Sequence, residues 1–258
     1  MIVRYERNGK VKHGWMVEED QKVRVIEGDI YKLQGTKPIM TGLELPLSEV
    51  NLLAPCTPSK VVCIGLNYYD HAEEMGIEAP AEPLMFMKPS TTVVGPGQPI
   101  VYPKLTQQLH YEGELAVVIK KQAYQVKASE AEDFILGYTC AIDVTARDLQ
   151  HQDGQWTRSK SFDTFCPLGP AIAPKLDDQD LRIVTRVNGE VRQDGSTKQM
   201  IFPVPQLIEA ITAVMTLLPG DVILTGTPVG VGELQPGDEI SVSIEGIGTL
   251  TTHVVTHS

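Results

Sequence analysis

Residues 110–119, His-Tyr-Glu-Gly-Glu-Leu-Ala-Val-Val-Ile, restrict the possible folds more than any other stretch of the chain. Side chains alternate along a strand, so Leu115 and Val117 lie on one face and Glu112 and Glu114 on the other. Two neighbouring carboxylates repel each other and are costly to bury, so an enclosed carboxylate face requires a positive partner such as a divalent metal ion. A solvated strand face would explain the same two glutamates without a metal.

The chain has 258 residues, enough for one large domain or for a large domain and a small one. No apolar run reaches the length of a membrane helix, and charges interrupt the N-terminal segment where a signal peptide would be apolar. These features predict a soluble, cytoplasmic protein.

The formal net charge is −11, and no cluster of Lys and Arg occurs anywhere in the sequence. This charge argues against nucleic acid and against an acidic membrane surface as partners. If the substrate is an anion, positive charge must be supplied within the site.

The cysteines are few and irregularly spaced, which matches neither a zinc site nor a disulfide framework. We expect each of them to be a buried free thiol. They are Cys56, Cys63, Cys140 and Cys166.

Two domains are predicted, joined by a proline-containing linker at residues 54–60. Residues 1–55 alternate short apolar segments with turns, at Asn8-Gly9 and at the acidic residues 18–20, which predicts a small antiparallel β-rich domain. This part has no clustered catalytic residue types, so we expect a structural or oligomer-supporting role. Residues 56–258 would form the catalytic domain. Many short strands and few helices indicate an α+β, strand-dominated fold.

Three helices and one hairpin are predicted from local signals. Asp70 is placed to cap a short helix over residues 71–75, and residues 129–132 fit a capping box that starts a helix through residue 135. Residues 205–217 carry apolar side chains at a helical period, which predicts a core-facing helix. Asn188-Gly189 suits the turn of a hairpin.

Asp143 is the third acid to consider beside the two glutamates. It follows seven mostly apolar residues, where a strand emerges into a pocket, although it could equally cap the element that begins at Thr145. With Glu112 and Glu114 it would make an all-oxygen site, which suits Mg²⁺, Mn²⁺ or Ca²⁺ and disfavours zinc. Three protein ligands leave positions on the metal for substrate oxygens, which is a catalytic arrangement.

His71 and Glu74 are three residues apart and therefore neighbours on one helical face. A carboxylate beside an imidazole fixes its tautomer and makes the histidine a better general base. The alternative is an exposed helix whose acidic side chains are simply solvated.

Arg147, Gln150 and Lys160 follow Asp143 and could each be an ordinary surface residue. An anionic substrate beside a metal and three carboxylates nevertheless needs Arg or Lys close by. Residues 225–232 are rich in glycine but match neither a P-loop nor a dinucleotide fingerprint. A tight loop facing a ligand and an ordinary turn both remain open.

Seven motifs occur in an order that resembles the fumarylacetoacetate hydrolase family, in particular its branch of acylpyruvases, oxaloacetate decarboxylases and hydroxy-dienoate isomerases. The resemblance covers roughly residues 60–255 and is far more specific for the family than for the reaction. The motifs are Gly65-Leu-Asn-Tyr-Tyr-Asp-His-Ala-Glu-Glu-Met, Lys88-Pro-Ser, His110-Tyr-Glu-Gly-Glu, Asp143-Val-Thr-Ala-Arg-Asp, Lys160-Ser-Phe-Asp, Val187-Asn-Gly-Glu and Leu224-Thr-Gly-Thr-Pro-Val-Gly-Val-Gly.

The resemblance implies a mixed β-sandwich roll, a homodimer, and Mg²⁺ or Mn²⁺ held by Glu112, Glu114 and Asp143. It also implies that His71 and Glu74 form a catalytic pair on a lid over the substrate. The positions that match substrate contacts in similar proteins are Arg147, Gln150, Lys160 and Thr227.

One position departs from the pattern. Members close to the eukaryotic acylpyruvases tend to have Arg just before the Asn-Tyr pair, whereas this chain has Leu66. This difference removes one possible contact with the substrate carboxylate, and it favours the bacterial dienoate-type members. The additional N-terminal domain favours them too.

The expected function is a metal-dependent hydrolase that cleaves a carbon–carbon bond in a 2,4-dioxo acid of the acylpyruvate type. His71, polarised by Glu74, would deprotonate a water, and Lys160 would stabilise the enolate that is expelled. Decarboxylation of oxaloacetate and isomerisation of hydroxy-dienedioates are the alternatives. A further alternative is a non-catalytic module that binds a metal and a 2-oxo acid.

Overall fold

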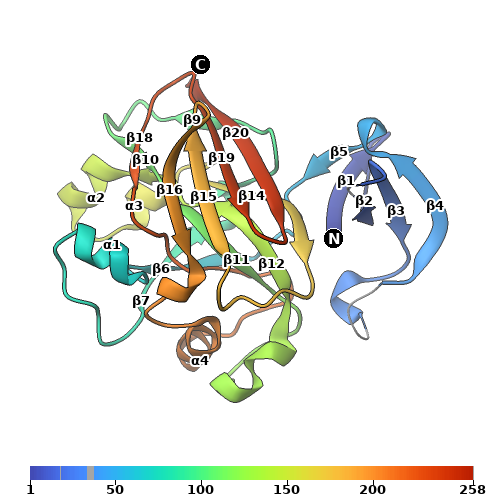
Figure 1. The fold of residues 1–258 in the computed structure, drawn as a ribbon, viewed down its shortest axis with the longest axis horizontal. Coiled ribbons are helices and arrows are strands. Elements are labelled where there is room, and N and C mark those ends of the chain that lie inside the picture. The colour runs from blue at the N-terminus through green and yellow to red at the C-terminus, as the bar shows by residue number, and fades with distance from the viewer. Residues whose placement is uncertain (18, 34–37, 258) are drawn as a thin grey trace.

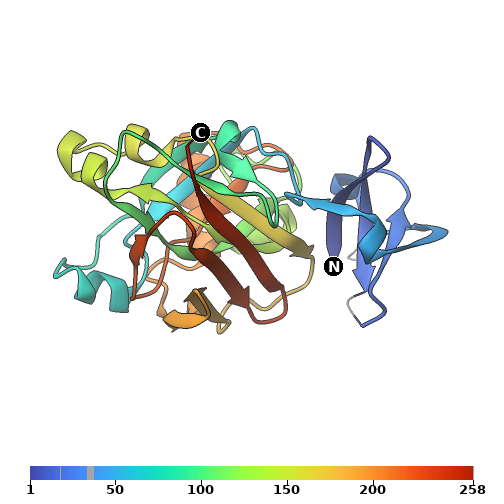
Figure 2. The same ribbon diagram turned by 90° about the horizontal axis from the view of Figure 1, so that it is seen from above.

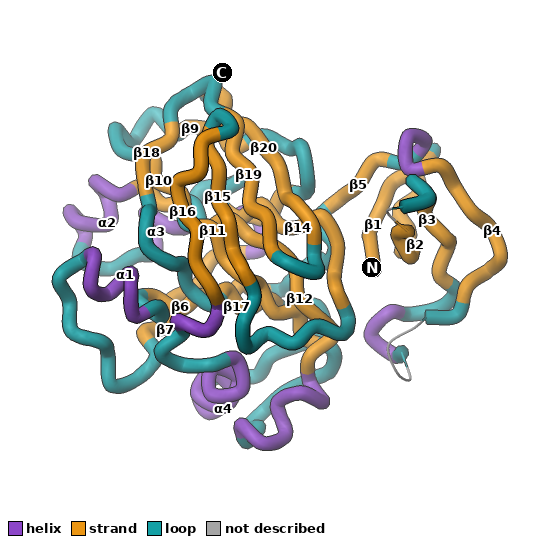
Figure 3. The backbone as a smooth tube through the Cα atoms, viewed as in Figure 1, coloured by secondary structure: helices purple, strands orange, loops and turns teal. Residues whose placement is uncertain are grey.

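The structure is a computed structural model that describes residues 1–17, 19–33 and 38–257. Glu18, part of the predicted acidic turn, lies outside these residues. Within them, strands dominate and helices are short (Figure 3), which confirms the predicted α+β, strand-dominated class.

The N-terminal strands form an antiparallel meander, as predicted, and lie at one end of the molecule in two perpendicular views (Figures 1 and 2). Asn8 and Gly9 turn the chain between the first two strands with the positive φ angles, 53° and 72°, that such a turn requires. A domain boundary between residues 55 and 56 stays a prediction. The strands are β1 (Ile2–Arg7), β2 (Lys10–Val17), β3 (Lys22–Ile26), β4 (Met40–Pro46) and β5 (Asn51–Leu53).

These strands continue into the largest sheet of the described residues, because Ile2 of β1 pairs with Ile172 of β14. The order along this sheet is β4-β3-β2-β1-β14-β12-β11-β17-β6-β7, with β5 paired to β1 and β8 to β14. Its remaining strands are β6 (Lys60–Gly65), β7 (Leu84–Pro89), β8 (Val93–Val94), β11 (Gly113–Ile119), β12 (Ile135–Ile142), β14 (Cys166–Ala173) and β17 (Val222–Leu224).

The remaining strands form two smaller sheets. The five-stranded sheet has the order β16-β15-β19-β20-β9 and contains the predicted hairpin at residues 187–191. The three-stranded sheet has the order β13-β10-β18. Their strands are β9 (Ile100–Tyr102), β10 (Leu109–Tyr111), β13 (Thr145–Ala146), β15 (Arg182–Val187), β16 (Glu190–Ser196), β18 (Gly232–Leu234), β19 (Glu239–Ile244) and β20 (Gly248–Thr256).

Residues 110–119 do not form the single strand that the sequence predicts. The chain breaks at Glu112, so β10 belongs to the three-stranded sheet and β11 to the largest one. β11 is also buried on both faces: Val117 packs into the core shared with the five-stranded sheet, and Val118 packs into a second cluster behind it. The prediction of one face buried and one face polar is therefore wrong beyond Glu114, because layers of structure cover both sides.

The helices are short and lie at the edges of the sheets, and α1 and α2 lie at the end of the molecule opposite the N-terminal strands (Figures 1 and 2). Among the described residues, no helix is both long and apolar enough to cross a membrane. The helices are α1 (Tyr69–Glu74), α2 (Arg147–Asp153), α3 (Thr157–Lys160) and α4 (Val204–Val214), with 3₁₀ turns η1 (Ile30–Lys32), η2 (Leu47–Glu49), η3 (Ser90–Thr92), η4 (Ala128–Phe134) and η5 (Thr197–Gln199).

Helix boundaries differ from the predictions at three places. α1 begins two residues earlier than expected, at Tyr69, so Asp70 lies in its first turn and is not its N-cap. The predicted capping box lies within η4, a 3₁₀ helix without a side-chain cap, and residue 135 already belongs to β12. α4 ends at Val214, which is exposed, because the chain turns there into extended structure at Met215.

The four cysteines are all buried and free, as predicted. Burial raises the pKa of each thiol. They are therefore small apolar side chains of the core under ordinary conditions.

Candidate active site

The three predicted metal ligands meet at one point of the fold. Glu112 lies in the break between β10 and β11, Glu114 is the second residue of β11, and Asp143 follows the end of β12. β11 and β12 are antiparallel neighbours with Glu114 opposite Ala141, so the start of one strand lies beside the end of the other. All three side chains are buried, and each offers a carboxylate oxygen within 4.8 Å of the other two. The solvated-face alternative is therefore wrong.

Lys160 on α3 bridges two of these acids. Its Nζ donates to Oε2 of Glu112 at 3.0 Å and to Oδ2 of Asp143 at 2.7 Å, and its side chain is almost inaccessible. Burial lowers the pKa of Lys160, but the two carboxylates more than offset this effect, so the pKa stays above its ordinary value. The two carboxylates thus favour the charged ammonium form of Lys160.

Arg147 at the start of α2 supplies a second cation. Its guanidinium donates to Oε1 of Glu112 at 2.6 Å and to Oε1 of Gln150 at 2.5 Å. Burial raises the pKa of Glu112, but Lys160 and Arg147 reverse the shift and hold this pKa well below the usual range. Arg147, Gln150 and Lys160 are therefore not the separate surface residues of the alternative reading.

Glu114 has no such cation. Among the described residues it makes no ion pair, and its Oε2 accepts a hydrogen bond from the Gly226 amide at 2.7 Å. Burial and the nearby carboxylates of Asp143 and Glu112 raise its pKa well above the ordinary value. This carboxylate calls for either a proton or a further positive charge.

The donor set fits a divalent cation. It consists only of carboxylate oxygens, which suits Mg²⁺ or Mn²⁺ better than zinc. Oδ1 of Asp143 is buried and accepts no hydrogen bond of good geometry from the residues that the structure describes, although the Lys88 ammonium lies 2.7 Å from it as an ion-pair partner. The three acids and the three cations beside them sum to zero charge, so a divalent ion would leave the site with an excess of two positive charges. The cations are Lys88, Arg147 and Lys160.

Lys88 is a site residue to which the sequence assigned no role. It lies on β7 with a fully buried side chain, and its Nζ donates to the carbonyls of Val144, Lys160 and Phe165 at 2.8 to 3.0 Å. The same nitrogen lies 2.7 Å from Oδ1 of Asp143. The available signal was the Lys88-Pro-Ser motif, but local sequence does not show that a lysine so near an exposed loop is buried.

His71 and Glu74 are paired on α1. Nδ1 of His71 lies 3.0 Å from Oε2 of Glu74, and the His71 side chain is 9% exposed. Glu74 also accepts the amide of Gly230 at 3.1 Å. The alternative of a fully solvated helix is therefore wrong for this pair. α1 is hydrogen-bonded through Glu74 to the glycine-rich loop, residues 225–232.

The glycine-rich loop holds two acids through its backbone. Gly226 donates to Glu114 and Gly230 donates to Glu74, so its amides face the site. The Thr227 hydroxyl is buried, donates to the carbonyl of Gly113 at 2.9 Å and accepts from Gln193 at 2.8 Å. The loop therefore contacts residues of the site, while a contact between Thr227 and a substrate stays a prediction.

A cavity of about 200 Å³ joins these groups. Glu112, Glu114 and Lys160 line it, His71 faces it from α1, and apolar side chains form much of its wall. Its volume is below the roughly 300–1,000 Å³ of sites for drug-sized ligands, so it suits a small molecule. All the predicted site residues line it except Asp143 and Glu74, which are hydrogen-bonded to the lining residues Lys160 and His71 respectively.

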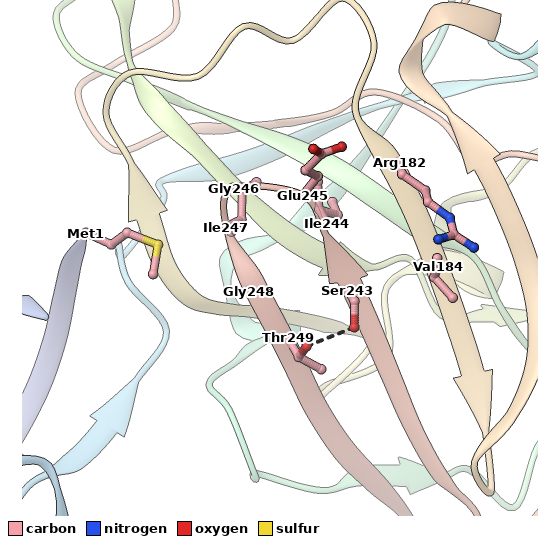
Figure 4. A pocket seen from close by; sticks show the side chains of 10 residues that line it. All are labelled: Met1, Arg182, Val184, Ser243, Ile244, Glu245, Gly246, Ile247, Gly248 and Thr249. Atoms are coloured by element: carbon pink, nitrogen blue, oxygen red, sulfur yellow. Dashed lines mark hydrogen bonds between the residues drawn. The ribbon is translucent and has the colours of Figure 1, made fainter. Parts of the chain in front are cut away.

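A wider groove of about 660 Å³ lies where Met1 approaches the hairpin of β19 and β20 (Figure 4). Glu245 and Arg182 are the charged side chains among the residues drawn there, and the Ser243 and Thr249 hydroxyls bond across the hairpin at 2.8 Å. It holds none of the acids of the triad. The smaller cavity is therefore the better candidate for chemistry.

Comparison with known proteins agrees with this geometry. Residues 60–255 match the model of the fumarylacetoacetate (FAA) hydrolase C-terminal family, and residues 1–55 match the Rv2993c-like N-terminal family. The chain belongs to the fumarylacetoacetate hydrolase family of enzymes, which confirms the resemblance found in the sequence.

Three relatives illustrate the family. The human mitochondrial oxaloacetate tautomerase FAHD2A is 47% identical over 224 residues, 82% of this chain and 71% of that protein. The structure of 2-hydroxyhepta-2,4-diene-1,7-dioate isomerase from Mycobacterium marinum is 45% identical, with a TM-score of 0.91 over 100% of this chain and 98% of that one. Fumarylpyruvate hydrolase from Pseudomonas aeruginosa, in complex with Mn²⁺ and pyruvate, is 33% identical, with a TM-score of 0.74 over 80% of this chain and 92% of that one.

Proposed function

We propose that this enzyme hydrolyses a carbon–carbon bond in a 2,4-dioxo acid of the acylpyruvate type, with Mg²⁺ or Mn²⁺ as cofactor. The observation that carries the proposal is His71, which is paired with Glu74 and faces the same small cavity as Glu112 and Glu114 of the acidic triad. A protein that only bound a metal and a 2-oxo acid would not need a base there. The similar fumarylpyruvate hydrolase, in complex with Mn²⁺ and pyruvate, supports the choice of metal and of acid.

Glu112, Glu114 and Asp143 would hold the metal, which when bound polarises the 2-oxo group as a Lewis acid. Lys160 and Arg147 would face the carboxylate of the substrate and fix its orientation, with Gln150 and Thr227 beside them. Burial makes these charges effective, because little water screens them.

His71 would act as the general base. Its Nδ1 contacts Glu74, so Nε2 is the nitrogen that accepts the proton of an attacking water. The water oxygen bonds to the distal carbonyl carbon, and the bond between that carbon and the neighbouring methylene breaks. The electron pair passes to the enolate of the 2-oxo acid, whose charge Lys160 stabilises, and a proton returned to the methylene carbon completes the reaction.

Proton transfer without bond cleavage is the second candidate. The human oxaloacetate tautomerase and the hydroxy-dienedioate isomerase structure favour it, since both reactions named for these proteins move a double bond. Decarboxylation of oxaloacetate passes through the same kind of enolate and needs no attacking water.

One assay panel tests the proposal. It contains acetylpyruvate, fumarylpyruvate, oxaloacetate and a hydroxy-dienedioate, each with Mg²⁺, with Mn²⁺ and with chelator. Metal-dependent cleavage of a dioxo acid supports hydrolysis. Tautomerisation of oxaloacetate or isomerisation of the dienedioate, without cleavage of a dioxo acid, supports the second candidate, and release of CO₂ from oxaloacetate supports decarboxylation. Tight binding without turnover of any member would support the non-catalytic module.

We further propose that the protein is a homodimer in the cytoplasm. The match of residues 1–55 to a separate N-terminal family supports a distinct role for this part, such as support of the dimer. Light scattering on the full chain measures the mass, and a deletion of residues 1–55 that stayed dimeric would contradict that role.

A further inference from the structure

Helix α2 presents three polar side chains to the cavity. Arg147, Gln150 and His151 all line it, and their spacing of three and four residues places them on one helical face. Arg147 and Gln150 bond to each other, and Arg147 also reaches Glu112. His151 has no role in the proposed chemistry.

His151 is exposed at the outer part of this face, whereas the Arg147 side chain is 14% exposed. Four residues of helix advance by about 6 Å, so the face leads from the triad toward the mouth of the cavity. A molecule held at the triad by its 2-oxo acid end would extend along this face toward His151.

His151 also differs from the other basic side chains of the lining in having no acid partner. Lys160 and Arg147 each contact Glu112, and His71 contacts Glu74. No hydrogen bond or ion pair joins the His151 side chain to any residue described in the structure. Its ring nitrogens are available to a ligand.

Aromatic side chains form part of the cavity wall. Phe86 and Trp156 pack edge to face with ring centroids 5.0 Å apart, and both line the cavity. A Cβ at Gly65 would come within 2.7 Å of the Trp156 ring, so the indole packs directly on β6. An anionic tail crossing this wall finds its next basic group at His151.

The charge balance of the site also favours a substrate with a second carboxylate. The site has equal numbers of buried acids and adjoining cations, so a divalent metal would give it an excess of two positive charges. A 2-oxo acid with one carboxylate neutralises half of this excess in the ground state. A second carboxylate on the substrate would neutralise the rest.

We propose that His151 is a specificity-determining residue that binds a second carboxylate at the far end of the substrate. The site then selects dicarboxylic 2-oxo acids over monocarboxylic ones of the same length. The proposal rests on the proposed function only in requiring that a 2-oxo acid occupies the cavity.

The test is calorimetric binding to the Mg²⁺-loaded full-length protein at one fixed pH. Two pairs of unreactive probes differ in the second carboxylate: 2-oxoglutarate against 2-oxopentanoate, and 2-oxoadipate against 2-oxohexanoate. Pyruvate carries the shared head without a tail. The wild-type protein should bind the dicarboxylate of at least one pair about tenfold more tightly, the size of one hydrogen bond to a charged group.

His151→Asn should reduce this preference to about twofold or less and leave pyruvate affinity within twofold of the wild type, whereas His151→Arg should keep the preference. His253→Asn, which removes an exposed histidine from β20, is the matched control and should change neither the preference for the dicarboxylate nor the affinity for pyruvate. A preference that survives in His151→Asn, or a wild-type protein without preference in either pair, overturns the assignment of His151 while pyruvate still binds. Failure of pyruvate and every other probe to bind overturns the proposed function itself.

Discussion

The ammonium group of Lys88 lies 2.7 Å from Oδ1 of Asp143, and both side chains are inaccessible to solvent. The hydrogen bonds of this ammonium go to three backbone carbonyls, which belong to the residue after Asp143, to Lys160 and to Phe165. One buried lysine therefore supports the segments that carry a candidate metal ligand and a candidate catalytic lysine.

Lys88→Met should destabilise the protein by about 3–5 kcal/mol, because it leaves three buried carbonyls without their donor and Oδ1 of Asp143 without its cation, while Lys160 still pairs with Oδ2. Urea denaturation measures the free energy of unfolding. Lys104→Met, at an exposed lysine, is the control and should change it by less than about 0.5 kcal/mol. A loss below about 1 kcal/mol for Lys88→Met would show that Lys88 does not support the site.

Glu114→Gln should abolish metal binding and turnover together while the fold remains. The amide oxygen of glutamine can still accept the hydrogen bond of Gly226, but the charge that a metal needs is gone. Calorimetric titration with Mn²⁺ measures metal binding, and circular dichroism checks that the fold remains. If Glu114→Ala keeps full activity in the presence of chelator, the assignment of the site is wrong.

His71→Asn should lower the rate of dioxo-acid hydrolysis by about 10² to 10⁴, which is the usual contribution of a general base. Decarboxylation of oxaloacetate should survive in part, since it needs no attacking water. Glu74→Gln should have a smaller effect in the same direction, because it removes the orienting partner and leaves the base. Equal losses of both reactions in His71→Asn would point instead to proton transfer as the common step.

Asp221 lies outside the candidate active site and makes the stability of the protein depend on pH. Its inaccessible carboxylate accepts hydrogen bonds from the Ser59 amide and hydroxyl, the Leu218 amide and Lys60. Burial raises the pKa of Asp221, but the bonds from Lys60, Ser59 and Leu218 reverse the shift, so the pKa lies below its ordinary value. The stabilisation is therefore fully present above the unfolded pKa of about 3.9 and is lost as pH falls through the lower folded value.

Asp221→Asn should accordingly lower the free energy of unfolding by about 2–3 kcal/mol at pH 7. The difference from the wild type should shrink as the pH is lowered below about 4, which unfolding in urea at several pH values measures. Asp133→Asn, at an exposed aspartate, is the control. A difference that stays constant down to pH 2 would mean that the charge of Asp221 contributes nothing.

Local sequence patterns correctly predicted two contacts between residues that are close in the chain. Asn188 and Gly189 do turn a hairpin, and His71 and Glu74 do meet, because a helix brings residues three apart together whatever surrounds it. The α-helix predicted from the capping box at residues 129–132 does not form. A seven-residue 3₁₀ helix occupies this segment and leads directly into β12. Such boundaries depend on what packs against the segment.

The sequence by itself determined the residue types of the site: three acids suited to a hard divalent ion, a histidine with an adjacent carboxylate, and a strand-dominated chain to carry them. Tertiary structure alone decided that Glu112 lies in a break between two sheets and that Lys88 is buried beside Asp143. It also decided that the amides of Gly226 and Gly230 hold Glu114 and Glu74. These pairs are 55 to 156 residues apart in the chain, and their contacts arise from the packing of strands whose pairing no local pattern specifies.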